Sequence, residues 1–229
     1  IYKNHPDSAK NINNMAIIEG GMVKMANLSI AGSFSVNGVS KLHTDILKQD
    51  IFKDYYMMDK DRFHAITNGI TFRRWIANCN PELTQLIDST IGKGWLKDAD
   101  KLQGLKKFAN DTDFQKKYDA IKRKNKQVVA DYILEHNGVK INPDSIFDIQ
   151  CKRLHEYKRQ MMNILHIIVE YNRVLTEPSY AENYYPKTYI FGAKAAPGYK
   201  RAKLIIKLIN SVGDMINHAP RIKDKIKGI

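Results

Sequence analysis

The nine residues 151–159, with the sequence CKRLHEYKR, combine four permanent cations with an imidazole and a phenol. They follow directly after SIFDIQ at 145–150, a stretch typical of a strand. Arg153 offers a planar guanidinium that can grip a phosphate bidentately, whereas Lys152 and Lys158 act as point charges. The common alternative for such a charge run is a solvated basic helix start. Because ligands collect beyond the carboxyl ends of strands in open α/β sheets, the position favours a pocket for phosphate dianions.

The stretch GAKAAPGYK at 192–200 also follows a predicted strand, and its glycines could expose backbone N–H groups to an anion. It does not match a P-loop. Its glycines are one residue too far apart, Tyr199 disrupts the Gly-Lys order, and no Ser or Thr follows. This excludes a P-loop ATPase. It leaves open two interpretations: a packing loop, or a loop that contributes Lys194 as a further cation.

Isolated polar residues give weaker signals. His155 stands among cations, which favours a structural hydrogen-bonding role over metal binding, and the other histidines have no zinc-binding spacing. Asn68 and Gly69 are typical of a tight turn, which could be an ordinary loop or could present Asn68 to a ligand. The two cysteines are too few for a disulfide scaffold, and no local pair of carboxylates suggests a hydrolase. We therefore predict no metal site.

The elements that must position these loops follow from periodicity. We predict strands at 145–151 and 188–192, and helices at 111–135, which ends at Asn137-Gly138, and 159–175. The expected core stripe of the first helix is Phe114, Tyr118, Ile121, Val128 and Tyr132. That of the second is Met161, Ile164, Leu165, Ile168, Tyr171 and Leu175. A third stripe comprises Ala202, Ile205, Ile206, Ile209, Val212 and Ile216. Alternating strands and helices predict an α/β fold with a parallel sheet. Towards the N-terminus a helix is expected over 39–48, and a domain crossing near 67–69.

The composition limits the functional classes. The chain has 229 residues, a formal charge of +13 and 43% hydrophobic residues, which is ordinary for a globular protein. Such a charge raises nucleic-acid binding as a candidate, but the basic residues are scattered and no nucleic-acid-binding consensus is present. We find neither a secretory signal nor a run of about eighteen apolar residues. A cytoplasmic location without membrane association is therefore expected, and nucleic acid is an unfavoured partner.

Residues 152–160 resemble the Lys-Arg-[Leu/Ile]-His-Glu-Tyr-Lys-Arg-Gln signature of the glycogen, starch and maltodextrin phosphorylases. Four other blocks resemble the same family in the same order: SVNGV at 35–39, TNGI at 67–70 followed by RRW at 73–75, INP at 141–143, and FGAKAAPGY at 191–199. The resemblance implies a Rossmann-like parallel sheet with flanking helices, as part of a two-Rossmann-domain glycosyltransferase. Residues 1–66 would be the mainly helical end of the N-terminal domain, and 67–229 the first part of the C-terminal domain.

The resemblance also implies an activity. Inorganic phosphate would attack the terminal α-1,4-linked glucose of a glucan with retention, giving glucose 1-phosphate, with pyridoxal 5'-phosphate as the cofactor. Arg153 matches the arginine that binds the substrate phosphate, and Lys158 the lysine between that phosphate and the cofactor phosphate, so both are expected to be catalytic. Lys152 matches a contact to the cofactor phosphate, Lys194 is a weaker candidate for the same role, and Asn68 matches an asparagine that hydrogen-bonds a glucose hydroxyl.

The family's Gly-Thr-Gly-Asn-Met-Lys segment, whose lysine forms the Schiff base with the cofactor, has no counterpart in residues 1–229. We therefore expect this chain to be a fragment of a homodimeric, bacterial-looking glucan phosphorylase, and to be inactive by itself. Two alternatives stay open. They are a non-catalytic sugar- or phosphate-binding module and a basic nucleic-acid-binding domain.

Overall fold

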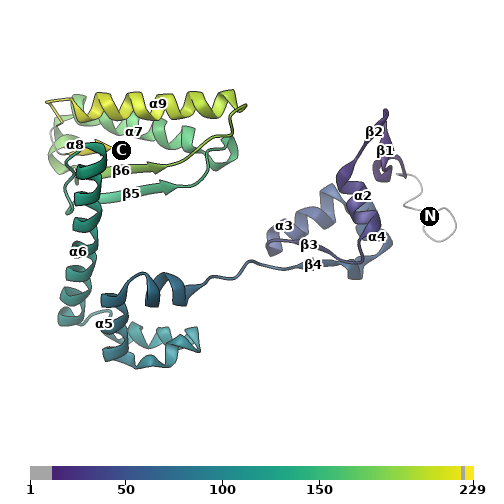
Figure 1. Cartoon of the computed structure of the whole chain (residues 1–229), viewed down its shortest axis with the longest axis horizontal. Helices are drawn as coiled ribbons and strands as arrows, with labels where there is room; N and C mark the ends of the chain where they lie inside the picture. The colour runs from purple at the N-terminus through teal and green to yellow at the C-terminus, as the bar shows by residue number, and fades with distance from the viewer. Residues whose placement is uncertain (1–11, 223–224) are drawn as a thin grey trace. The chain divides into compact units, whose positions relative to one another are not determined.

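The structure, a computed structural model, describes residues 12–222 and 225–229. The chain forms two compact units, Ile1–Phe72 and Arg73–Ile229, each with its own core (Figure 1). The assignment of 1–66 and 67–229 to two phosphorylase domains stays a prediction.

The first unit is built from short elements around a small core. An antiparallel pair, β1 (Ile18–Glu19) and β2 (Met22–Val23), precedes α2 (Met25–Gly32), and β3 (Val36–Gly38) pairs in parallel with β4 (Phe63–Ala65). Between β3 and β4 lie α3 (Lys41–Ile46), a π-helical stretch (Leu47–Ile51) and α4 (Lys53–Met58). The buried apolar side chains of this core are Met15, Ile30, Tyr55 and Phe63.

Two predictions for this unit need adjustment. The helix expected over 39–48 begins two residues later, because the Ser40 hydroxyl accepts a hydrogen bond from the His43 N–H and so caps α3. The tight turn expected at Asn68 and Gly69 is wrong. Residues 66–71 form no turn, and Gly69 is not among the glycines with positive φ. Asn and Gly permit a turn but do not impose one.

The second unit begins with helices. A π-helical stretch (Arg73–Asn78) precedes α5 (Pro81–Ile91), and the 3-10 stretches Lys93–Leu96 and Ala99–Phe108 lead to the long helix α6 (Thr112–Asn137). Both ends of α6 are as predicted. Asp111 caps its N-terminus, and Gly138 ends it in the left-handed conformation, with φ of 68°.

The predicted core stripe of α6 is partly wrong. Val128 and Tyr132 are 62% and 59% exposed, whereas the buried residues of the helix are Ala130 and Ile133. The C-terminal part of α6 packs on the sheet, where Ala130 and Ile133 cluster with Phe147 and Ile190. An apolar stripe along a helix therefore did not identify the contacting face here.

A three-stranded parallel sheet with the order β5-β6-β7 forms the rest of this unit, as the alternation of strands and helices predicts. Its strands are β5 (Ile146–Cys151), β6 (Lys187–Gly192) and β7 (Ile226–Gly228). The connecting helices are α7 (Gln160–Thr176), α8 (Pro178–Asn183) and α9 (Lys200–Asn217) (Figure 1). Ile146 pairs with Lys187, and Lys187 with Ile226, so each strand lies beside the next one in sequence.

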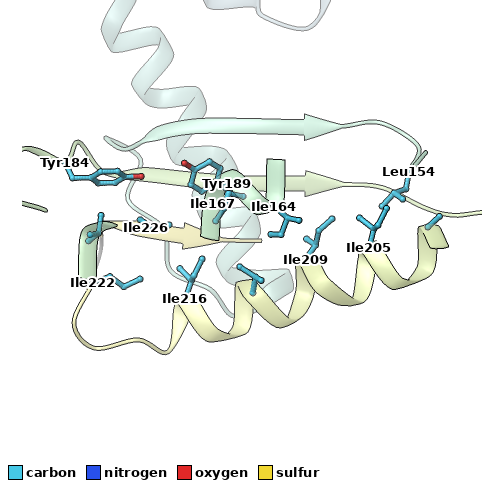
Figure 2. Close-up of a cluster of buried hydrophobic side chains, with 13 residues drawn as sticks. Leu154, Ile164, Ile167, Tyr184, Tyr189, Ile205, Ile209, Ile216, Ile222 and Ile226 are labelled. Atoms are coloured by element: carbon cyan, nitrogen blue, oxygen red, sulfur yellow. The ribbon is translucent and has the colours of Figure 1, made fainter. Parts of the chain in front are cut away.

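Helices cover both faces of this sheet. Tyr189 belongs to the cluster formed with α7 and α9, while its neighbour Ile190 packs with the α6 cluster. Successive strand residues point to opposite faces, so α7 and α9 lie on one face and α6 on the other. Figure 2 shows Ile205, Ile209 and Ile216 of α9 directed at the strands. The α9 stripe is confirmed, with Ile206 half-buried at its border.

The predicted α7 stripe is partly right, since Ile164 is buried and Ile168, Tyr171 and Leu175 pack half-buried against the core. Met161 and Leu165 are exposed, while Ile164, Ile167 and Val174 are buried together with the polar residues Gln160 and Glu170. Burial of these polar groups requires hydrogen-bond partners, which lie elsewhere in the chain. No helix in the described part of the chain is both long and apolar enough to cross a membrane.

Candidate anion-binding site

The candidate site lies where β5 and β6 end. The loop after β5 carries residues 152–159, and the loop after β6 carries residues 193–199. Two backbone hydrogen bonds hold these loops side by side, from Lys152 N–H to the Gly192 carbonyl at 2.9 Å and from Leu154 N–H to the Lys194 carbonyl at 3.2 Å. The carboxyl ends of adjacent parallel strands thus bring both sequence motifs together.

The two loops enclose a hollow of about 540 Å³. Its lining carries three permanent cations, from Arg153, Lys158 and Lys194, and among the described residues that line it there is no carboxylate. The remaining lining residues are Leu154, His155, Tyr157, Ala195, Ala196, Pro197 and Tyr199. Three cations without an acidic neighbour in the lining make a concave surface that attracts a multiply charged anion.

The predicted site residues fall into three groups. Arg153 and Lys194 are exposed and Lys158 is half-buried, and all three line the hollow. Lys152 is exposed and lies outside the lining, although its backbone ties the loops together. Asn68 is an exposed residue of the first unit and lies in a stretch without regular structure. The hollow is lined by residues of the second unit, and Asn68 is not among them.

Aromatic rings form one wall of the hollow. The centre of the His155 ring lies 4.7 Å from the ring centre of Tyr157 and 5.4 Å from that of Tyr199. The Lys158 ammonium lies 5.6 Å from the Tyr157 ring centre. His155 Nδ1 accepts a hydrogen bond from the Tyr157 N–H at 3.4 Å, which is the structural role expected for it. Sequence reasoning missed Tyr157 and Tyr199, because nothing in the local pattern separates a wall residue from an ordinary surface tyrosine.

A carboxylate outside the lining links the two loops. Glu156 accepts hydrogen bonds from the Tyr199 hydroxyl at 2.7 Å and from Arg201 Nη1 at 2.6 Å. These bonds, with that of Arg201 the strongest, hold the pKa of Glu156 below its usual value, while the Glu156 carboxylate raises the pKa of Tyr199. Arg201 neutralises Glu156, so the acid does not offset the charge of the lining cations. The sequence offered no signal for this link, which joins residues far apart in the chain.

Comparison with known proteins identifies the family of the chain. The family model described as carbohydrate phosphorylase matches residues 1–229. The chain is 47% identical over 227 residues to the glycogen phosphorylase of Bacillus subtilis (strain 168), covering 99% of this chain and 28% of that protein. It is 44% identical over 227 residues to the muscle form of glycogen phosphorylase of Homo sapiens, covering 98% of this chain and 27% of the relative. The chain thus spans little more than a quarter of the length of these relatives. It belongs to the carbohydrate phosphorylase family.

Proposed function

We propose that this chain is part of an α-1,4-glucan phosphorylase, which transfers the terminal glucose of a glucan to inorganic phosphate and releases glucose 1-phosphate with retention. The single observation that carries the proposal is the hollow lined by Arg153, Lys158 and Lys194, built from residues within two of the blocks that resemble the family. In this proposal β5, β6 and β7 with their helices are part of a Rossmann-like domain.

The proposed role of the cations is to bind and orient phosphate. The guanidinium of Arg153 donates two parallel hydrogen bonds to phosphate oxygens, which fixes the orientation of the anion as well as its position. Lys158 adds a point charge beside it. Since opposite charges attract more strongly where water is excluded, the half-buried Lys158 is expected to contribute more per contact than the exposed Lys194.

The same lining fits the phosphate group of pyridoxal 5'-phosphate, because it offers ammonium and guanidinium donors and no carboxylate. Lys158 and Lys194 are the residues of the lining that would hold this group, with Lys152 at the margin. When bound, the cofactor supplies a phosphate group for acid-base and electrostatic work. The source of its Schiff-base lysine, the homodimer, the cytoplasmic location and the role of Asn68 with the glucan all stay predictions.

The proposal is tested by exchanging segments. The matched segment of the Bacillus subtilis relative is replaced by this chain, and glucose 1-phosphate formed from maltodextrin and inorganic phosphate is measured for the hybrid, for the hybrid with Arg153→Met, and for the chain alone. We expect activity only in the hybrid with Arg153. A folded hybrid that binds phosphate without turnover would support a non-catalytic phosphate-binding module. Nucleic-acid binding that weakens steeply with salt, in a chain that does not bind phosphate, would contradict both the phosphorylase and the phosphate-binding module.

A further inference from the structure

Gln160 is a fully buried polar residue directly beneath the cation-bearing loop. It is 1% exposed, although it is the first residue of α7. Its Nε2 donates to the Arg153 carbonyl at 3.2 Å, and its Oε1 accepts from the His155 N–H at 3.5 Å. A buried amide is stable only when its donors and acceptors are satisfied, so these two contacts hold the backbone on both sides of Leu154.

A second amide holds the other end of the loop. Gln150, on β5, donates from Nε2 to the Lys158 carbonyl at 3.1 Å. Asn163, on α7, in turn donates from Nδ2 to Gln150 Oε1 at 3.0 Å, which fixes the orientation of the Gln150 amide. The peptide groups of Arg153 and Lys158 are thus both bonded to side chains of the sheet and helix below them.

The loop needs such support because its backbone is strained. Arg159 has φ of 61° and is the only residue other than glycine with positive φ in the described part of the chain. This conformation costs a residue with a Cβ atom roughly 1 kcal/mol or more, and it persists only where surrounding contacts impose it. Arg159 lies between the 3-10 turn Glu156–Lys158 and Gln160, so relaxation of Arg159 would shift Lys158 directly.

We infer that Gln160 is a positioning residue for Arg153, and that Gln150 with Asn163 performs the same task for Lys158. The inference deepens the proposed function and rests on it: the amides give the two cations the fixed spacing that a phosphate anion requires. Gln160 itself does not line the hollow. The competing explanation is that Gln160 is only a satisfied core residue at the start of α7.

The test compares three variants of the full chain. Gln160→Met keeps the length of the side chain and removes both contacts, while Gln150→Met removes the contact to Lys158. The control is Thr188→Val, which removes another buried hydrogen bond, between Thr188 Oγ1 and Ser145 Oγ at 2.7 Å, at the opposite end of the same sheet. Inorganic phosphate affinity is measured by calorimetry, backbone exchange of residues 153–159 by hydrogen-deuterium exchange, and stability by thermal unfolding.

We expect both glutamine variants to weaken phosphate binding about tenfold and to speed exchange of the loop amides by a similar factor, since each loses the hydrogen bonds that hold one end of the loop. Thr188→Val should lower the unfolding temperature and change neither of these. Phosphate affinity and loop exchange at wild-type values in a folded Gln160→Met variant would overturn the role of Gln160. Should that variant not fold, Gln150→Met decides by the same criteria. If the unaltered chain binds no phosphate, the proposed function fails and loop exchange alone decides whether the amides position the loop.

Discussion

The ammonium group of Lys187, at the start of β6, lies 2.7 Å from Oε2 of Glu170 on α7. The Tyr180 hydroxyl donates to the other carboxylate oxygen at 2.6 Å, and Glu170 is 7% exposed. Burial alone would raise the pKa of Glu170, but the hydrogen bonds from Lys187 and Tyr180 outweigh it and lower the pKa to about 2. This pair of a buried carboxylate and a half-buried ammonium group joins α7 to β6.

The pair predicts a specific loss of stability in acid. The pKa of Glu170 lies below its unfolded value of about 4.3, so its contribution is present above that pH and is lost as the pH falls towards 2. The shift corresponds to about 3 kcal/mol. Glu170→Gln should lower the free energy of unfolding by about that order at pH 7 and should flatten its pH dependence between about 5 and 2. Urea unfolding at a series of pH values measures both effects.

Glu177→Gln is the matched control for this prediction. Glu177 pairs with Arg173 near the end of the same helix, but both side chains are 45% exposed. Exposed pairs contribute little because water and salt screen them. The control should therefore keep the acid dependence of the unaltered chain. An unchanged pH profile in Glu170→Gln would show that Glu170 does not carry the acid sensitivity.

Arg153→Lys is expected to weaken phosphate binding about tenfold, because a point charge replaces a planar fork that binds two oxygens. The control is Arg123→Lys on α6, whose guanidinium pairs with Asp144 away from the hollow. Calorimetric titration of the full chain with inorganic phosphate measures the two affinities. Equal affinity in Arg153→Lys and the unaltered chain would contradict a bidentate contact.

Gly38→Ala should strongly destabilise the first unit. A Cβ atom at Gly38 would lie 2.7 Å from the backbone nitrogen of Thr44 and 2.8 Å from its Cα, so the backbone itself would have to move. We expect a loss of about 1 to 3 kcal/mol, as for other overpacked sites. At Gly32 in the same unit a Cβ atom would meet nothing within 4 Å, so Gly32→Ala should have little effect. Urea unfolding followed through amide signals of β3 and β4 separates these outcomes.

Asp111→Ala should destabilise α6 by about 1 kcal/mol, the usual effect of a lost N-cap. Asp111 Oδ1 accepts from the Asp113 N–H at 2.9 Å and from the Phe114 N–H at 3.0 Å. Asp119→Ala, at an exposed position within the helix, should instead be neutral or slightly stabilising because alanine favours helices. Amide exchange in the first turns of α6 reports the difference, and equal exchange in the two variants would count against the cap.

Local signals made part of this fold predictable from the sequence. The ends of α6 depend on Asp111 and Gly138, which act within one turn, and α9 has an uninterrupted apolar stripe. The burial of α7 was mispredicted in part because Gln160 and Glu170 occupy core positions normally held by apolar residues. Their partners, the Arg153 carbonyl and Lys187, come from other elements, so helical periodicity alone could not identify them.

The candidate site shows the same limit. Arg153, Lys158 and Lys194 were predictable because each follows a strand end, and parallel strands end at the same edge of a sheet. Lys152, also predicted to contact phosphate, lies outside the hollow. No feature of the sequence predicted the positive φ of Arg159, since arginine is not a residue that favours that conformation.

The order of the three strands has a consequence for how this part of the chain reaches its native state. Among the described residues β5 pairs with β6 and β6 with β7, so each strand of this sheet pairs with the next one in the sequence. Paired residues are separated by about forty positions, as in Ile146 and Lys187, so these contacts are non-local. Assembly can therefore proceed from the N-terminal strand outwards during translation. The loop at 152–159 can form its hydrogen bonds to the loop at 193–199 as soon as β6 has paired with β5.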